Sequence, residues 1–154
     1  MLFRTHIIFF IFIFLLIFNK INAPFIFFFI GLISTVIPDI DSNNSRVGRK
    51  PLFKILTAFN KHRGFFHSLF FGILFFSFIY FFVKKEEIAF AFALGYFLHL
   101  FLDSLTKQGI NLFWPFNLKI KGFIRSGGKI ELIIFIVLSF LILVFFFRMI
   151  NSYF

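Results

Sequence analysis

The stretch KHRGFFHSLFFGILFFSFIYFFV, residues 61–83, decides what kind of fold this chain can form. After a polar start it is an almost uninterrupted run of Phe, Leu and Ile, and a helix needs about 20 such residues to cross a bilayer. Two histidines, His62 and His67, lie at the mouth of the run. A helix that only anchors a protein in the membrane does not require histidines there, so the stretch predicts both a membrane protein and a functional site.

The composition agrees with a membrane protein. Of the 154 residues, 60% are hydrophobic and 34 are Phe, which is more apolar surface than a soluble domain of this size can bury. We interpret the net charge of +10 as loop cations that follow the positive-inside rule, and not as a nucleic-acid-binding surface. The chain has no Cys, which excludes thiolate sites, so any metal must be held by His, Asp and Glu.

Five apolar runs predict an all-α, polytopic membrane bundle that forms one domain over residues 1–154. The spans are expected near 7–21, 24–38, 65–83, 88–105 and 131–150. The last three runs are long enough to span, whereas the first two are short and would tilt, thin the bilayer or form a tight hairpin around NKINAP. The first run also resembles a signal peptide, but Pro24 after the cleavage position and His6 at the edge of the run argue against cleavage.

The cations predict the orientation. Six Lys and Arg residues lie between the second and third runs, and five lie between the fourth and fifth. Both loops and the N-terminus are therefore expected in the cytoplasm, in a multi-pass protein of the inner or plasma membrane. All four His and four of the six acidic residues then fall on the cytoplasmic side: His6, Asp39, Asp41, His62, His67, His99, Asp103 and Glu131. Because Lys and Arg alone set the orientation, this convergence is independent evidence for a site.

The pair formed by His99 and Asp103 carries the strongest chemical signal. Residues four apart share one helix face, and a charged residue in a span costs about 2.5–3.5 kcal/mol, so such pairs usually serve function. The alternative is a hydrogen bond that only ties helices together. Asp39 and Asp41 follow Pro38, where a loop should start, and both could face one cation, although Asp-rich turns are common at membrane exits.

The remaining candidates depend on local geometry. His62 and His67 are five apart and reach one site only if the helix breaks near Gly64; otherwise they are interfacial histidines. Arg63 could hold an anion, and Ser68 could cap the helix. Glu131 begins the last run, where a carboxylate also stabilises a helix N-terminus. His6, near the N-terminus, has the weakest case.

Together these residues predict a metal site. Neutral imidazole and carboxylate are the ligand mix of hydrolytic Zn, Mn and Mg sites. We expect a divalent metal, Zn before Mn or Mg, and one or more ions. The expected metal ligands are His6, Asp39, His62, His67, His99 and Asp103.

Six short motifs resemble the YdjM-like family of membrane-bound metal-dependent hydrolases, also called LexA-binding inner-membrane-associated hydrolases. In the family's order they are RTH, PDIDS, HRGFFHS, GYFLHLFLDSLTKQG, WPF and GGKIE. The resemblance implies a helical integral membrane protein with hydrolase activity. Position by position, the polar residues of these motifs match His6, Asp39, His67, His99, Asp103 and Glu131.

The sequence thus favours a metal-dependent hydrolase of a phosphoester at the cytoplasmic face, with a phospholipid or lipid-linked phosphate as substrate. Asp41 and Glu131 are expected as carboxylates that ligate or act as base, and Arg63 as the residue that holds the anion. One alternative is a metal-ion or proton transporter, which predicts ionisable groups throughout the membrane depth. The other is a non-catalytic membrane adaptor, which predicts polar residues that do not converge.

Overall fold

The computed structural model describes residues 1–41 and 64–153, and within them the fold is all-α as predicted. The α-helices are α1 (Phe3–Ile17), α2 (Pro24–Val36), α4 (Leu69–Phe78), α5 (Glu86–Ser104) and α6 (Lys129–Tyr153). Short 3-10 turns extend them, namely η1 (Phe18–Lys20), η2 (Ile37–Asp41) and η4 (Phe65–His67), and the π-helical turn η5 (Ile79–Val83) follows α4. The loop between α5 and α6 carries two isolated backbone bridges, Thr106 with Ile124 and Ile110 with Ile120.

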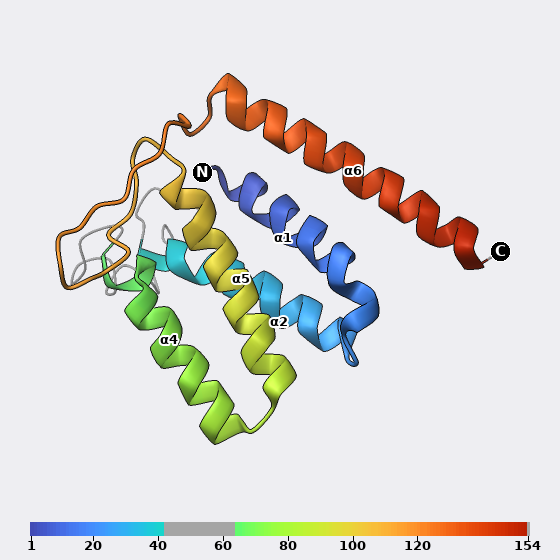
Figure 1. Ribbon diagram of the computed structural model, residues 1–154, viewed down its shortest axis with the longest axis horizontal. Coiled ribbons are helices and arrows are strands. Elements are labelled where there is room, and N and C mark those ends of the chain that lie inside the picture. Colours follow the sequence, from blue (N-terminus) through green and yellow to red (C-terminus); the bar gives the residue numbers. More distant parts are fainter. Residues whose placement is uncertain (42–63, 154) are drawn as a thin grey trace.

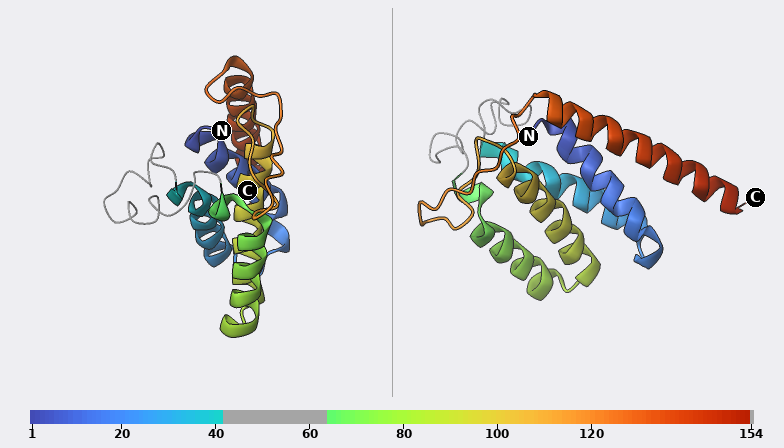
Figure 2. Two further views of the ribbon diagram at one scale, coloured as in Figure 1. Left: turned by 90° about the vertical axis from the view of Figure 1, so that its left-hand side faces the viewer. Right: turned by 45° about the horizontal axis from the view of Figure 1, so that its top comes forward.

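The helices pack as a bundle with α2 and α5 at its centre, where the most extensive helix–helix contact lies. Helix α4 packs on α5, α1 packs on α2 and α5, and α6 lies outermost against α1 (Figures 1 and 2). Small residues allow the central contact: a Cβ atom on Gly95 would collide with the Gly31 carbonyl and the Ser34 hydroxyl. Close backbone approach through small residues is how helices pack in membranes, where no hydrophobic effect drives them together.

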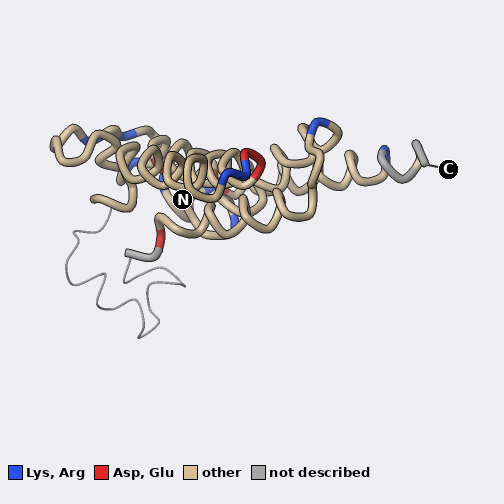
Figure 3. The backbone as a smooth tube through the Cα atoms, turned by 90° about the horizontal axis from the view of Figure 1, so that it is seen from below, with Lys and Arg blue, Asp and Glu red and all other residues tan. Residues whose placement is uncertain are grey.

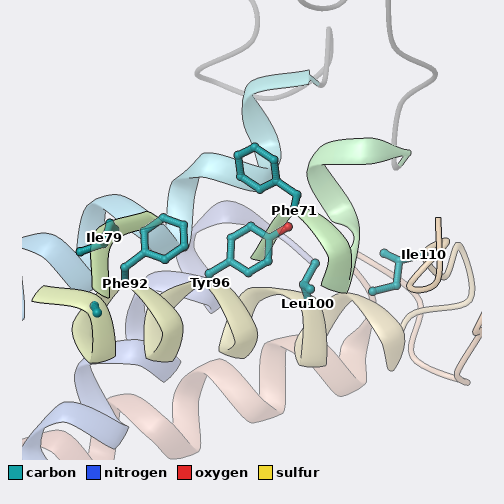
Figure 4. Close-up of a cluster of buried hydrophobic side chains, with 7 residues drawn as sticks. Phe71, Ile79, Phe92, Tyr96, Leu100 and Ile110 are labelled. Atoms are coloured by element: carbon teal, nitrogen blue, oxygen red, sulfur yellow. The ribbon is translucent and has the colours of Figure 1, made fainter. Parts of the chain in front are cut away.

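Aromatic side chains fill the space between the helices. One buried cluster joins α4 to α5 and includes Phe71, Phe92, Tyr96 and Leu100 (Figure 4). A second cluster joins α1, α2 and α5 through Phe10, Phe14, Phe27 and Ala91. Many other Phe, Leu and Ile residues stay exposed on the outer helix faces, as expected for surfaces that meet lipid.

Within residues 1–41 and 64–153, three helical segments are long and apolar enough to cross a membrane: Phe3–Lys20, Glu86–Ser104 and Lys129–Arg148. Two further apolar helices, Pro24–Asp39 and Leu69–Val83, are shorter. The first run is thus longer than expected, and the third is shorter because Phe65–His67 forms a separate turn before α4 begins. Figure 3 shows long helical stretches without any charged residue; residues 132–147 of α6 are one of them.

Candidate metal centre

The fold brings histidines and carboxylates from four segments to one end of the bundle. His6 lies early in α1, Asp39 in the turn η2 after α2, His67 in η4, and His99 and Asp103 in the last turns of α5. These helix ends meet at the same end of the molecule in Figures 1 and 2. The side chains of His6, His67, His99 and Asp103 are at most 2% exposed, whereas that of Asp39 is 18% exposed.

Four ligand atoms form a closed ring in which oxygen and nitrogen alternate. Oδ1 of Asp39 lies 3.9 Å from Nε2 of both His67 and His99. Oδ2 of Asp103 likewise lies 3.9 Å from both nitrogens. A point equidistant from four atoms with this spacing lies about 2.4–2.8 Å from each, depending on how flat the ring is, and Zn–N and Zn–O bonds are about 2.0–2.2 Å. The ring therefore fits one divalent ion after a small inward movement of the side chains.

A second group consists of His6, His99 and Asp103, whose ligand atoms lie within 4.8 Å of one another, as do those of Asp39, His67 and His99. Nε2 of His6 is 3.3 Å from Oδ1 of Asp103, and the His6 ring stacks on the His99 ring with centroids 4.0 Å apart. Asp103 thus turns one oxygen to His6 and the other to His67 and His99, as a carboxylate does when it bridges two ion positions. The N-terminal amino group also contacts the Asp103 carboxylate.

One hydrogen bond fixes which nitrogen His99 offers. Nδ1 of His99 lies 2.7 Å from the carbonyl oxygen of Thr35. A carbonyl only accepts, so Nδ1 carries the proton and Nε2 keeps its lone pair toward the site. Nε2 is buried and has no hydrogen-bond partner in the part of the chain that the structure describes. Such an atom costs free energy unless something binds it, and a metal ion would do so. Since His99 has only one nitrogen to offer, it can serve one ion, and the four-atom ring is the more complete site.

His67 is positioned by the start of α4. The Ser68 side chain accepts a hydrogen bond from the Phe71 N–H at 3.2 Å, and Ser68 is the N-cap of α4. His67 does not belong to α4 itself, because it lies in the 3-10 turn η4 that precedes this cap. The Tyr96 hydroxyl lies 2.9 and 2.8 Å from the carbonyl oxygens of Phe66 and Ser68, the residues on either side of His67. Tyr96 therefore ties the turn that carries His67 to the helix that carries His99.

Glu131 lies outside both groups of candidate ligands. It accepts hydrogen bonds from the Leu2 N–H at 2.6 Å, the Thr5 hydroxyl at 2.7 Å and the Gly127 N–H at 2.6 Å. Both carboxylate oxygens are thus engaged, and Glu131 joins the start of α1 to the start of α6. This arrangement makes Glu131 a residue that positions α1, and with it His6.

Three candidates from the sequence are not placed. His62 and Arg63 lie outside the described residues, and so does the side chain of Asp41. Sequence reasoning in turn missed two supports of the site, the Thr35 carbonyl and the Tyr96 hydroxyl. Tyr96 precedes His99 by three residues and so shares its helix face, which is a usable signal. No signal marks Thr35, because every residue has a carbonyl.

Comparison with known proteins identifies the family of this chain. The sequence model of the family described as YdjM inner membrane protein matches residues 1–153. Over 93 residues the chain is 31% identical to the uncharacterized protein YvsG of Bacillus subtilis (strain 168), covering 59% of this chain and 58% of YvsG. Over 93 residues it is also 31% identical to the inner membrane protein YdjM of Escherichia coli (strain K12), covering 55% of this chain and 47% of that protein. The chain spans about half the length of these relatives, and no solved structure matches it.

Proposed function

This chain belongs to the YdjM inner membrane protein family, and from that premise we propose that it is a metal-dependent hydrolase that cleaves a phosphoester at the membrane surface. The observation that carries the proposal is the alternating ring of Asp39, His67, His99 and Asp103 ligand atoms, with neighbouring atoms 3.9 Å apart. Imidazole and carboxylate ligands in this ratio suit Zn first, and Mn or Mg as alternatives. When bound, such an ion supplies Lewis acidity toward a phosphoryl oxygen.

The protein's own residues orient the site and limit the access of water. His67, His99 and Asp103 are almost completely buried, and only Asp39 is partly exposed. Substrate would therefore approach from the side of Asp39, in the turn η2. Asp39 belongs to that turn, which supports a carboxylate at the open side of the site; Asp41 as base stays a prediction from the sequence. Arg63 as the anion-binding residue stays a prediction from the sequence.

A lipid-linked substrate suits the position of the site. The candidate ligands lie at the ends of helices whose outer faces expose large apolar residues such as Phe25, Phe70 and Phe90. A lipid tail could remain in the bilayer beside these faces while its phosphate reaches the end of the bundle. A soluble phosphoester would gain nothing from the apolar surface.

The distribution of ionisable groups supports hydrolysis over transport. A metal-ion or proton pathway needs such groups at several depths of the membrane. Among the residues that the structure describes, the candidate ligands gather at one end of the bundle, and Glu86 and Glu87 lie at the start of α5, at its other end. A non-catalytic adaptor has no need for four ligand atoms around one point.

Metal analysis of the purified full chain, followed by a substrate panel, tests the proposal. We expect at least about one equivalent of a divalent metal per wild-type protein, and none in the His99→Ala and Asp103→Asn variants. Glu87→Gln, at the far end of α5, is the matched control and should keep the metal. The metal-loaded protein is then assayed with phospholipid, isoprenyl phosphate, nucleotide and carboxyl-ester substrates. Full metal content in both ligand variants, or turnover of carboxyl esters alone, contradicts the proposal.

A further inference from the structure

A cavity of about 540 Å³ lies where the loop before α6 meets the residues that follow α5. Its lining includes three cationic side chains, those of Lys107, Arg125 and Lys129. The wall is completed by Phe123, Ser126, Gly127, Gly128 and Ile130. Among the residues that the structure describes, none that lines the cavity is acidic, so the described wall carries charge of one sign.

Backbone hydrogen bonds hold Lys107 and Arg125 on two neighbouring segments of the loop. The Lys107 N–H donates to the Ile124 carbonyl at 2.9 Å, and the Gly122 N–H donates to the Thr106 carbonyl at 2.9 Å. Thr106 and Ile124 form a parallel bridge, so Lys107 and Arg125, the next residue of each segment, lie side by side. Gly127, with a φ of +74°, then turns the chain toward Lys129 and α6. The cavity is therefore built by the fold, not by the chance approach of long side chains.

The positive charge of this cavity is not neutralised within the described chain. None of its three cations forms an ion pair with a carboxylate in residues 1–41 or 64–153. The hydroxyl oxygen of Ser126 is buried and has no hydrogen-bond partner there. Like charges in one cavity repel each other and favour an anion. A phosphate carries enough charge and enough acceptor oxygens to engage the cations and the hydroxyl together.

Exposed apolar side chains lie beside the cations of the cavity, at the start of a candidate membrane-spanning segment. Phe123 is 69% exposed and Ile130 is 48% exposed, beside the cations. The candidate span Lys129–Arg148 begins at the cavity, and only 11% of its apolar window is buried. A cationic cavity beside an exposed apolar helix matches an amphiphile with an anionic head. We propose that this cavity binds the phosphate of a lipid whose tail lies along α6.

The cavity is coupled to the metal centre through short connections. Lys107 is four residues beyond Asp103, and the Gly127 N–H donates to Glu131, which accepts from the Thr5 hydroxyl next to His6. The use of this cavity as the substrate's phosphate subsite rests on the proposed hydrolase function. The binding of lipid phosphate does not, so the two can be tested apart.

Titration of the full chain in a neutral detergent with dihexanoyl phosphatidic acid tests the inference. The double variant Lys107→Gln with Arg125→Gln should bind this lipid at least about tenfold more weakly, because two charged hydrogen bonds are lost. Lys119→Gln, an exposed lysine of the same loop outside the cavity lining, is the matched control and should bind within about twofold of wild type. Ser126→Ala is a milder variant that leaves all cations in place and should weaken binding several-fold.

Four outcomes overturn the inference. Unchanged binding in the cavity variants, or an equal loss in Lys119→Gln, shows that the cavity is not the site. Equal binding of dihexanoyl phosphatidylcholine shows that the anionic head is not recognised. Competition by inorganic phosphate at the same concentration as the lipid shows that the cavity binds free phosphate and does not select a lipid phosphate. Metal content is measured in parallel: phosphatidic acid binding by a metal-free Asp103→Asn variant keeps the cavity separate from the fate of the hydrolase proposal.

Discussion

His99 and Thr35 are joined by a hydrogen bond of 2.7 Å from the imidazole Nδ1–H to a backbone carbonyl, across the contact between α5 and α2. The bond exists because Gly95 lets the two helices approach closely one turn before His99. It decides that Nε2, not Nδ1, faces Asp39 and Asp103. Helix packing and ligand orientation are therefore one feature in this protein, and it can be tested by mutation.

The Gly95→Ala substitution should disturb both the packing of α2 on α5 and the orientation of His99. The added Cβ collides with the Gly31 carbonyl and the Ser34 hydroxyl, and overpacking of this kind costs about 1–3 kcal/mol. We expect a lower Tm and a weaker metal affinity, because α2 moves away from His99. Phe101→Leu, on the exposed face of the same helix, is the control. A Gly95→Ala protein with wild-type metal affinity would show that the Thr35 bond does not orient His99.

The four-atom ring predicts a hierarchy among the histidines. His67→Ala should remove the ion of the ring as completely as His99→Ala, since each loses one of four ligands. His6→Ala should leave that ion bound, because His6 lies against Oδ1 of Asp103, outside the ring. Elemental analysis of metal per protein measures this order. If His6→Ala strips the metal while His67→Ala retains it, the ion occupies the other group.

Tyr96→Phe tests the support of His67. Its hydroxyl lies within 2.9 Å of the Phe66 and Ser68 carbonyls, and an unpaired buried polar group costs about 1–3 kcal/mol. Loss of such an outer support typically lowers metal affinity about 10–100-fold without removing a ligand. Competition with a chromophoric chelator measures the affinity. Tyr80→Phe, an exposed tyrosine in η5, should behave as wild type; equal behaviour of the two variants would refute the role of Tyr96.

Glu131→Gln separates a positioning residue from a metal ligand. Its carboxylate accepts three hydrogen bonds, and an amide nitrogen in place of one oxygen faces a donor it cannot bind. We expect a loss of about 1.5–3 kcal/mol in stability, typical of charged hydrogen bonds, with the metal content unchanged. Thermal unfolding and metal analysis of the same sample distinguish a positioning role of Glu131 from a ligand role. Metal loss in a protein of unchanged Tm would make Glu131 a ligand.

The orientation in the membrane can be read by labelling. The chain has no Cys, so single Asn117→Cys and Lys85→Cys variants report one loop each. The positive-inside rule places the α5–α6 loop in the cytoplasm, so Asn117→Cys should resist an impermeant thiol reagent in intact cells. Lys85→Cys, between η5 and α5 at the opposite end of the bundle, should react. Reaction of Asn117→Cys from outside reverses the orientation of the site.

The sequence by itself determined the class of the fold and most of the candidate ligands. Long continuous apolar runs indicate helices in a bilayer, since a helix pairs its backbone polar groups within its own segment. The spacing of His99 and Asp103 determined that they share a helix face, and Pro38 marked the place where α2 gives way to the turn that carries Asp39. These are local properties, which periodicity and single residues encode.

Only the tertiary structure decided which candidates meet. It placed Glu131 in a hydrogen-bonded link between α1 and α6, selected Nε2 of His99 through the Thr35 carbonyl, and tied His67 to α5 through Tyr96. It also shortened the third apolar helix, because His67 occupies a turn of its own before the Ser68 cap. Apart from the local Ser68 cap, these features depend on contacts between residues 28 to 129 positions apart, and most of them use a backbone group. Side-chain identity carries no record of such contacts, because any residue offers the same carbonyl and packing alone decides which one is reached.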